Sequence, residues 1–204
     1  HWLTQNEGLL ESTNAFIYKD QSGFIWISSL DGLNRFDGRT MQSFRTDPSN
    51  PNSIYGNNIQ SPFFENKKGD IWFVTEDAIN CYRKTKGHFE HYFIRPDAIP
   101  NSREQYYAFH LEQDRYLWVR ADEYLYRFDT YYPLDSTKTQ TLHPFSGMRC
   151  AVTCKKNGRV QRVYGCFWDL QPGLEVIDYN ENREIVRRQL LFTGSNQEAL
   201  TIRQ

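Results

Sequence analysis

The sequence predicts an all-β protein, a β-propeller built from four-stranded antiparallel blades. Three observations support this: a 46-residue repeat, a tryptophan that recurs in it, and alternating apolar stretches bounded by Gly, Asp and Asn. A unit of about 40 to 50 residues with four short strands and a tryptophan signature is typical of a propeller blade. Residues 23–38, GFIWISSLDGLNRFDG, return as residues 69–84, GDIWFVTEDAINCYRK, and in a more divergent form as residues 115–130, RYLWVRADEYLYRFDT.

The repeat keeps its aromatic residues in register. Trp26, Trp72 and Trp118 stand 46 residues apart. An aromatic residue follows each tryptophan ten residues later, and these are Phe36, Tyr82 and Phe128. A large apolar side chain that returns at one position of every unit is typical of packing between neighbouring units. We therefore assign these positions to the repeat structure, and the tryptophans to the core rather than to a ligand.

The strands of the first unit follow from period-two alternation rich in Ile, Phe, Tyr and Trp. Asp31-Gly32 and Asp37-Gly38 are expected to supply the positive φ angles that two-residue hairpin turns require. An alternating stretch precedes each tryptophan strand, and another aromatic stretch follows it, which gives four strands to a unit.

The fourth unit departs from the pattern. Asn157-Gly158 predicts a hairpin turn, but no tryptophan falls in register. An insertion around residues 166–172 comes before the stretch at residues 173–190, which restores the last two strands.

The repeats run without a linker, so we predict one domain, or a portion of one, over residues 1–204. The blades are expected at residues 14–50, 58–97, 105–146 and 148–192, with the first strand of a fifth at residues 196–204. A lone first strand gains little stability by itself. We therefore expect these residues to belong to a larger propeller of the seven-bladed type.

Composition and charge exclude several classes of protein. A hydrophobic content of 39% with 16% aromatic residues is typical of an ordered chain. The net charge is −1 with both signs interspersed, so we expect no nucleic-acid partner. No run of 18 apolar residues occurs, so any membrane attachment is expected through a segment outside this chain.

The cysteines and histidines predict neither a metal nor a cofactor. The four cysteines lack the paired CxxC spacing of a zinc site. Three of them, Cys150, Cys154 and Cys166, fall in the fourth unit, where strands could bring two together as a disulfide in an oxidising compartment. Buried free thiols are the alternative. His1 could hold copper through its amine and imidazole only with a second histidine on an immunoglobulin-like sandwich, which the repeat pattern does not predict.

Residues 3–54 resemble the opening of the two-component regulator propeller family, the periplasmic sensor of hybrid histidine kinases common in Bacteroidetes. The family pattern is a GL pair, then D-x-x-G-F-I-W-I, D-G-L-N-R-F-D-G and a D-P-x-x-P-x-S loop. These motifs stand here at residues 8–9, 20–27, 31–38 and 47–53. The first repeat matches nearly throughout and the second matches well, whereas the third lacks the turn glycines and the fourth lacks the tryptophan.

The resemblance implies a ligand-sensing ectodomain, in general for glycans or their breakdown products. It implies a periplasmic location, as part of an inner-membrane receptor that dimerises with itself and signals to a kinase. The chain has no kinase motif and no phosphate-binding Gly-rich loop, so we expect no enzymatic activity in this piece.

The candidate ligand site lies in the loops that enter the innermost strands, at residues 46–60 and 95–107. Their amide, hydroxyl and aromatic side chains suit the hydroxyls and the apolar ring face of a sugar. The candidates are Asn52, Ser53, Tyr55, Asn57, Asn58, Arg103, Glu104 and Tyr107. The same residue types also occur in any turn, for reasons of backbone geometry, so a purely structural role stays open.

Two further functions stay open. A propeller face or an unpaired strand edge could bind a protein, including a second copy of the chain. A glycan hydrolase or lyase would need carboxylates that face the channel. The carboxylates near inner-strand ends are Asp20, Glu65, Glu112 and Asp114, and near-equivalent repeat positions of the first three favour a role in turns.

Overall fold

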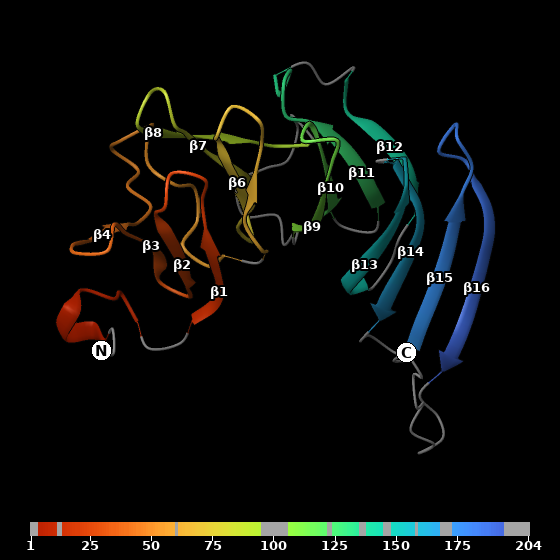
Figure 1. Cartoon of the computed structure of the whole chain (residues 1–204), viewed down its shortest axis with the longest axis horizontal. Helices are drawn as coiled ribbons and strands as arrows, with labels where there is room; N and C mark the ends of the chain where they lie inside the picture. Colours follow the sequence, from red (N-terminus) through yellow and green to blue (C-terminus); the bar gives the residue numbers. More distant parts are fainter. Residues whose placement is uncertain are drawn as a thin grey trace. The chain divides into compact units, whose positions relative to one another are not determined.

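The computed structural model is all-β and contains four antiparallel four-stranded sheets (Figure 1). It describes residues 4–11, 14–59, 61–94, 106–121, 124–134, 138–144, 148–157, 159–167 and 173–193. Within these ranges the helical structure is a single 3₁₀ turn, η1 (Gln5–Glu7). The predicted fold class is thereby confirmed. The expected fifth-blade strand and His1 lie outside the described residues.

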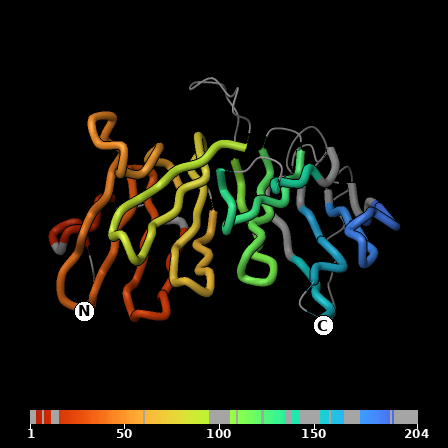
Figure 2. Tube along the Cα trace, turned by 90° about the horizontal axis from the view of Figure 1, so that it is seen from above, coloured from red at the N-terminus to blue at the C-terminus, as the bar shows by residue number. Residues whose placement is uncertain are grey.

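The chain divides into two compact units, His1–His143 and Pro144–Gln204. The single domain over the whole chain stays a prediction. In every sheet the strands pair in chain order, and Figure 2 shows each sheet as an up-and-down meander.

Three sheets begin in the first unit. The first sheet consists of β1 (Asn14–Lys19), β2 (Ile25–Ser29), β3 (Gly32–Phe36) and β4 (Met41–Phe44). The second consists of β5 (Phe64–Glu65), β6 (Ile71–Val74), β7 (Ile79–Arg83) and β8 (His88–Tyr92). The third consists of β9 (Tyr107–Glu112), β10 (Tyr116–Ala121), β11 (Tyr124–Asp129) and β12 (Gln140–Pro144).

The second unit holds one sheet with longer strands. Its members are β13 (Met148–Lys156), β14 (Arg159–Phe167), β15 (Gly173–Tyr179) and β16 (Ile185–Thr193). Asn157 has a φ of 53° in the turn between β13 and β14, where the sequence predicts an Asn-Gly hairpin. Asparagine tolerates this left-handed conformation because its short side chain can hydrogen-bond locally. Val163 and Ile177 are fully buried on the central strands of this sheet.

The core of the first unit lies between successive sheets. Trp26 packs against Tyr82 of the next sheet, with ring centroids 5.1 Å apart, and Trp72 packs against Phe128 at 6.0 Å. All three repeat tryptophans are at most 1% exposed. Arg35 also links the first two sheets, since its Nη1 donates to the Tyr82 hydroxyl at 2.7 Å. In both pairs the tryptophan contacts the aromatic residue of the following repeat.

The turns of the first sheet differ from the prediction. Gly32 and Gly38 have positive φ angles of 127° and 96°, but Asp31 and Asp37 do not. The Asp37 carboxylate instead accepts the backbone N–H groups of Arg39 and Thr40 at 2.7 and 2.6 Å. These hydrogen bonds, with one from the Thr40 hydroxyl, lower the pKa of Asp37 to about 2. An aspartate that hydrogen-bonds the backbone two residues ahead forms an Asx turn, which does not need a positive φ at the aspartate.

Candidate functional site

The long loop between β4 and β5 lies against the turn between β6 and β7. The Glu76 N–H donates to the Asn58 carbonyl at 3.3 Å, and the Asn58 side-chain amide donates to the Glu76 carboxylate at 3.0 Å. Ile59 and Thr75 form an isolated antiparallel bridge. The loop that enters the second sheet and the turn between its middle strands therefore form one face.

Asn80 fixes the middle of this loop from within the second sheet. Its side chain is fully buried, and its Oδ1 accepts the Tyr55 N–H at 2.8 Å. Its Nδ2 donates to the Tyr55 carbonyl at 3.1 Å, and the Thr75 hydroxyl donates to the same carbonyl at 2.7 Å. The backbone N–H and carbonyl of Tyr55 are thus both held by one amide side chain, which fixes the place of this residue in the loop.

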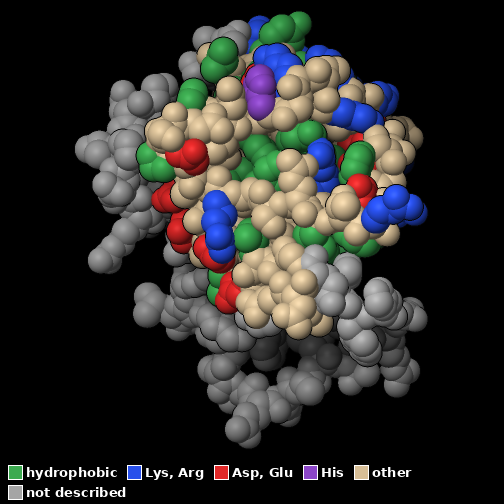
Figure 3. All heavy atoms as spheres, turned by 90° about the vertical axis from the view of Figure 1, so that its left-hand side faces the viewer, with side chains coloured by type: hydrophobic (Ala, Val, Ile, Leu, Met, Phe, Trp, Pro, Cys, Tyr) green, Lys and Arg blue, Asp and Glu red, His purple; other side chains and the backbone are tan. Residues whose placement is uncertain are grey.

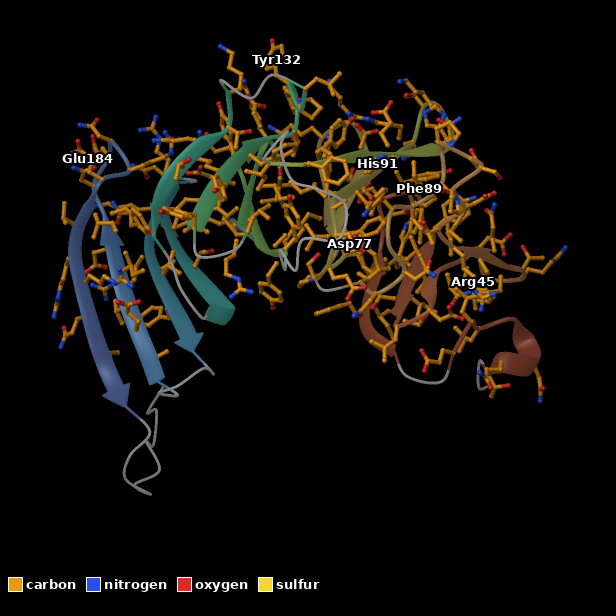
Figure 4. All side chains as sticks on the ribbon, turned by 180° about the vertical axis from the view of Figure 1, so that it is seen from behind. Arg45, Asp77, Phe89, His91, Tyr132 and Glu184 are labelled. Carbon is orange, nitrogen blue, oxygen red and sulfur yellow. The ribbon has the colours of Figure 1, made fainter. Side chains whose placement is uncertain are left out.

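The Tyr55 ring completes a small aromatic cluster with two side chains at the end of β8. Its centroid lies 4.9 Å from that of His91 and 5.3 Å from that of Phe93, and the latter two are 5.8 Å apart. His91 lies two residues beyond Phe89, a member of the core between the first two sheets (Figure 4). Phe93 is 37% exposed. The cluster therefore continues the core row of β8 to the surface, where ring faces and edges meet solvent.

Polar groups lie beside the loop residues that follow Tyr55. The Asp77 carboxylate lies beside Gly56, since a Cβ on Gly56 would stand 3.1 Å from Asp77 Oδ2. Burial, and then the charge of Glu76, raise the pKa of Asp77. Among the described residues, Asn58 Oδ1 is buried without a hydrogen-bond partner. We call Tyr55, Asn58, Asp77, His91 and Phe93 the Tyr55 site.

His91 contributes a half-buried ring to this site. Burial lowers its pKa, which favours the uncharged imidazole. Its Nδ1 is buried and makes no hydrogen bond in the described structure. With Asn58 Oδ1, it is one of two buried polar atoms of the site whose hydrogen-bonding capacity is not used within the described structure.

Several predicted site residues serve the loop itself. Ser53 Oγ accepts the Asp47 N–H at 3.0 Å, and Asn57 Oδ1 accepts the Thr46 N–H at 2.7 Å. The Asn52 carbonyl accepts the N–H of Phe89 on β8 at 3.1 Å. These groups order the loop, whereas Tyr55 and Asn58 stand at the Tyr55 site.

Of the other three candidates, Tyr107 lies among the described residues. Tyr107 lies at the start of β9, where its register partner is Arg120 of β10. Arg103 and Glu104 lie outside the described residues. The prediction of a site over both loops therefore stays untested, and the geometry bears only on the first loop.

Sequence reasoning missed Asn80, His91, Phe93 and Asp77. Asn80 carried a signal, because Asn34 stands 46 residues before it and asparagine is depleted in strands. Phe89 and His91 alternate on β8, and Phe93 continues the alternation one residue beyond its end, a pattern that places three rings on one face. Asp77 carried no such signal.

The carboxylates near inner-strand ends are used in structure. Asp20 Oδ2 accepts the Trp26 indole N–H at 2.8 Å, and Glu112 pairs with Arg127 at 2.7 Å. Glu65 accepts hydrogen bonds from the Tyr18 hydroxyl at 3.1 Å and from the Gln21 N–H. These partners are those of turn and core residues, which supports the structural role expected for the repeat carboxylates.

The surface of the first unit carries both signs of charge. Figure 3 shows basic and acidic side chains interspersed around a patch of apolar ones on the side of the first sheet. In the described part of the chain, no helix is long and apolar enough to cross a membrane.

No family model matches the chain. The chain is 38% identical over 52 residues to "Histidine kinase P4" of Formosa agariphila, a match that covers 26% of this chain and 4% of that protein. Its fold is similar to the extracellular domain of the hybrid two-component system BT3049 of B. thetaiotaomicron, with a TM-score of 0.68 at 20% identity over 91% of this chain. The corresponding domain of BT4673 gives 0.62 at 19% identity over 86% of this chain.

This chain has the propeller-like fold of those extracellular domains. They belong to the class of receptor that the first repeat resembles. The chain spans 26% and 24% of their lengths. It is also similar to an auxiliary nutrient binding protein from Bacteroides ovatus, with a TM-score of 0.54 at 12% identity over 90% of this chain and 48% of that one.

Proposed function

We propose that this chain is part of the extracytoplasmic sensing domain of a two-component receptor and that it binds an oligosaccharide. The observation that supports a ligand is the Tyr55 site, in which three rings cluster at the surface and an amide and a carboxylate lie beside the loop residues that follow Tyr55. The likeness to extracellular domains of hybrid two-component systems supports the sensing role and the location.

The chemistry of the Tyr55 site suits a sugar. Aromatic faces pack against the apolar face of a pyranose ring, while carboxylate and amide groups bond its hydroxyls. Asn58 is tied to Glu76 and Tyr55 to Asn80, so these contacts are fixed before a ligand arrives. A preformed site loses less conformational entropy on binding.

The sensing mechanism needs no reaction in this piece. A ligand that binds one arrangement of the receptor better than another shifts the population toward that arrangement, by at most its difference in affinity. The chain would supply this differential binding, and a kinase elsewhere in the receptor would read it.

Protein binding is a second candidate, because β16 is the last strand of its sheet. Val186 and Leu191 on this strand are 63% and 45% exposed. An open strand edge with apolar side chains can pair with another chain, including a second copy. This would also provide the receptor homodimer that the resemblance implies.

A thermal-shift and calorimetry screen with neutral oligosaccharides tests the proposal. At a concentration 100 times the dissociation constant, a bound ligand adds about 2.7 kcal/mol, which is a rise of roughly 5–10 °C in Tm at this size. Tyr55→Ala and Phe93→Ala should remove the shift. Tyr132→Ala is the matched control, since Tyr132 is an exposed tyrosine on the loop after β11.

Three outcomes decide between the candidates. Loss of the shift in the two site variants alone supports the Tyr55 site. A shift that survives both variants places the ligand elsewhere. No shift with any sugar, together with a dimer in light scattering that a Val186→Lys change dissociates, favours protein binding. Release of shortened sugars during the screen would overturn the non-enzymatic role.

A further inference from the structure

The second unit brings two of its three cysteines to directly opposed positions. β13 and β14 are antiparallel, and Cys150 is the register partner of Cys166. Opposed residues in an antiparallel pair have Cα atoms about 4.5–5.5 Å apart. Disulfides span Cα distances of about 4.4–6.8 Å. We propose that a disulfide between Cys150 and Cys166 joins these two strands.

The register selects this pair over the others in the unit. Cys154 stands opposite Arg162, and it is four residues along β13 from Cys150. At about 3.3 Å per residue, that separation is roughly 13 Å, beyond the reach of a disulfide. Cys166 is likewise four residues along β14 from the partner of Cys154. Cys154 is exposed and free.

The remaining cysteine is enclosed elsewhere. Cys81 is fully buried in the core between the second and third sheets of the first unit. Burial raises the pKa of its thiol, which disfavours the reactive thiolate. Cys81 is free, and of the three pairs that the second unit allows, only Cys150 with Cys166 combines opposed strands with a Cα spacing that a disulfide can span.

The reaction balances as a thiol–disulfide exchange. The two thiols lose two protons and two electrons, one S–S bond forms, and a disulfide donor, such as oxidised glutathione or an oxidised dithiol protein, is reduced to its thiols. In the cell the oxidant comes from an oxidising compartment, so the inference rests on the extracytoplasmic location proposed above. With a purified protein and a glutathione buffer, its test does not depend on ligand binding.

The test counts thiols in the purified chain. After equilibration in a buffer of reduced and oxidised glutathione, the protein is denatured in acid and alkylated, and its intact mass is measured. We expect two alkylated cysteines, rising to four after treatment with dithiothreitol. Four alkylated cysteines before reduction would overturn the proposal.

Peptide mapping assigns the bond. Trypsin leaves Cys150 and Cys154 together in residues 150–155 and Cys166 in residues 163–183. Cys154→Ser should therefore keep the cross-linked peptide pair, while Cys150→Ser should lose it. A bond that survives Cys150→Ser and disappears in Cys154→Ser would refute the assignment. If Cys150→Ser does not fold, fragmentation of the wild-type peptide between its two cysteines identifies the linked sulfur and decides the case.

Discussion

Asn80 and Asn34 occupy the same position in successive repeats, and each holds a different segment. Asn80 Oδ1 accepts the Tyr55 N–H at 2.8 Å, and Asn34 Oδ1 accepts the Leu10 N–H at 3.1 Å. Asn34 also donates to the Gly8 carbonyl at 3.2 Å. Both side chains are fully buried. Replacing either by alanine should release its own segment and leave the other in place.

The free-energy cost of Asn80→Ala follows from the loss of the Oδ1 atom that accepts the Tyr55 N–H. Leaving a buried donor unpaired costs about 1–3 kcal/mol, and we take about 2 kcal/mol for Asn80→Ala. Because about 1.4 kcal/mol is a factor of ten, the Tyr55 amide should exchange with solvent roughly 30-fold faster. The Leu10 amide should be unchanged in this variant. In Asn34→Ala the pattern should reverse.

Hydrogen exchange read at single residues by NMR is the assay. Amides of β6, in the middle of the second sheet, report on global unfolding and separate it from local release. Equal acceleration at Tyr55 and Leu10 in both variants would refute the reasoning, because it would show general destabilisation. No acceleration at Tyr55 in Asn80→Ala would show that the side chain does not hold the loop. A sugar that binds the Tyr55 site should bind Asn80→Ala more weakly and Asn34→Ala normally.

Three further changes have expected outcomes. Gly56→Ala should lower stability by about 1–2 kcal/mol in chemical denaturation, because φ is +78° and the new Cβ would stand 2.9 Å from Thr75 Oγ1; an unchanged midpoint would contradict this. Trp72→Ala should cost about 3–5 kcal/mol in the same assay, and a loss under 1 kcal/mol would contradict its place in the core. Burial of Glu90 raises its pKa, but hydrogen bonds from Lys86, Tyr92 and Arg83 outweigh this and lower it to about 2. The stabilisation is therefore present above pH 4.5 and lost as the pH falls toward 2. After allowance for solvent screening of this partly exposed carboxylate it amounts to about 1–2 kcal/mol, and Glu90→Gln should flatten that part of the pH profile of unfolding; an unchanged profile would rule out this contribution.

The fold could be predicted because its packing is periodic. Trp26 meets Tyr82, which is 56 residues away, one 46-residue repeat plus the ten-residue offset to the aromatic position. Trp72 contacts Phe128 at the same separation of 56 residues. A contact that recurs between neighbouring units requires the same residue type at the same position of every repeat. The strands and their order therefore follow from the sequence. The turns were predicted less well, because Asp37 can satisfy a tight turn through its side chain as well as through its own φ.

The site could be predicted only in part, because the same residue types order a loop and bind ligands. Asn57 and Asn58 are neighbours of the same type in the same loop, yet Asn57 bonds the loop backbone while Asn58 keeps a buried oxygen without a partner in the described structure. The difference depends on which backbone donor lies within about 3 Å of each amide, and that follows from the path of the loop over β8 and over the turn at Glu76. A sequence shows that a loop is rich in side-chain amides, but it does not show which of these amides already hydrogen-bond the backbone of the loop. Asn80 was the signal that could have narrowed the choice among the loop residues. An asparagine that recurs inside a strand is expected to hydrogen-bond a neighbouring segment, and here its side chain bonds the backbone of Tyr55.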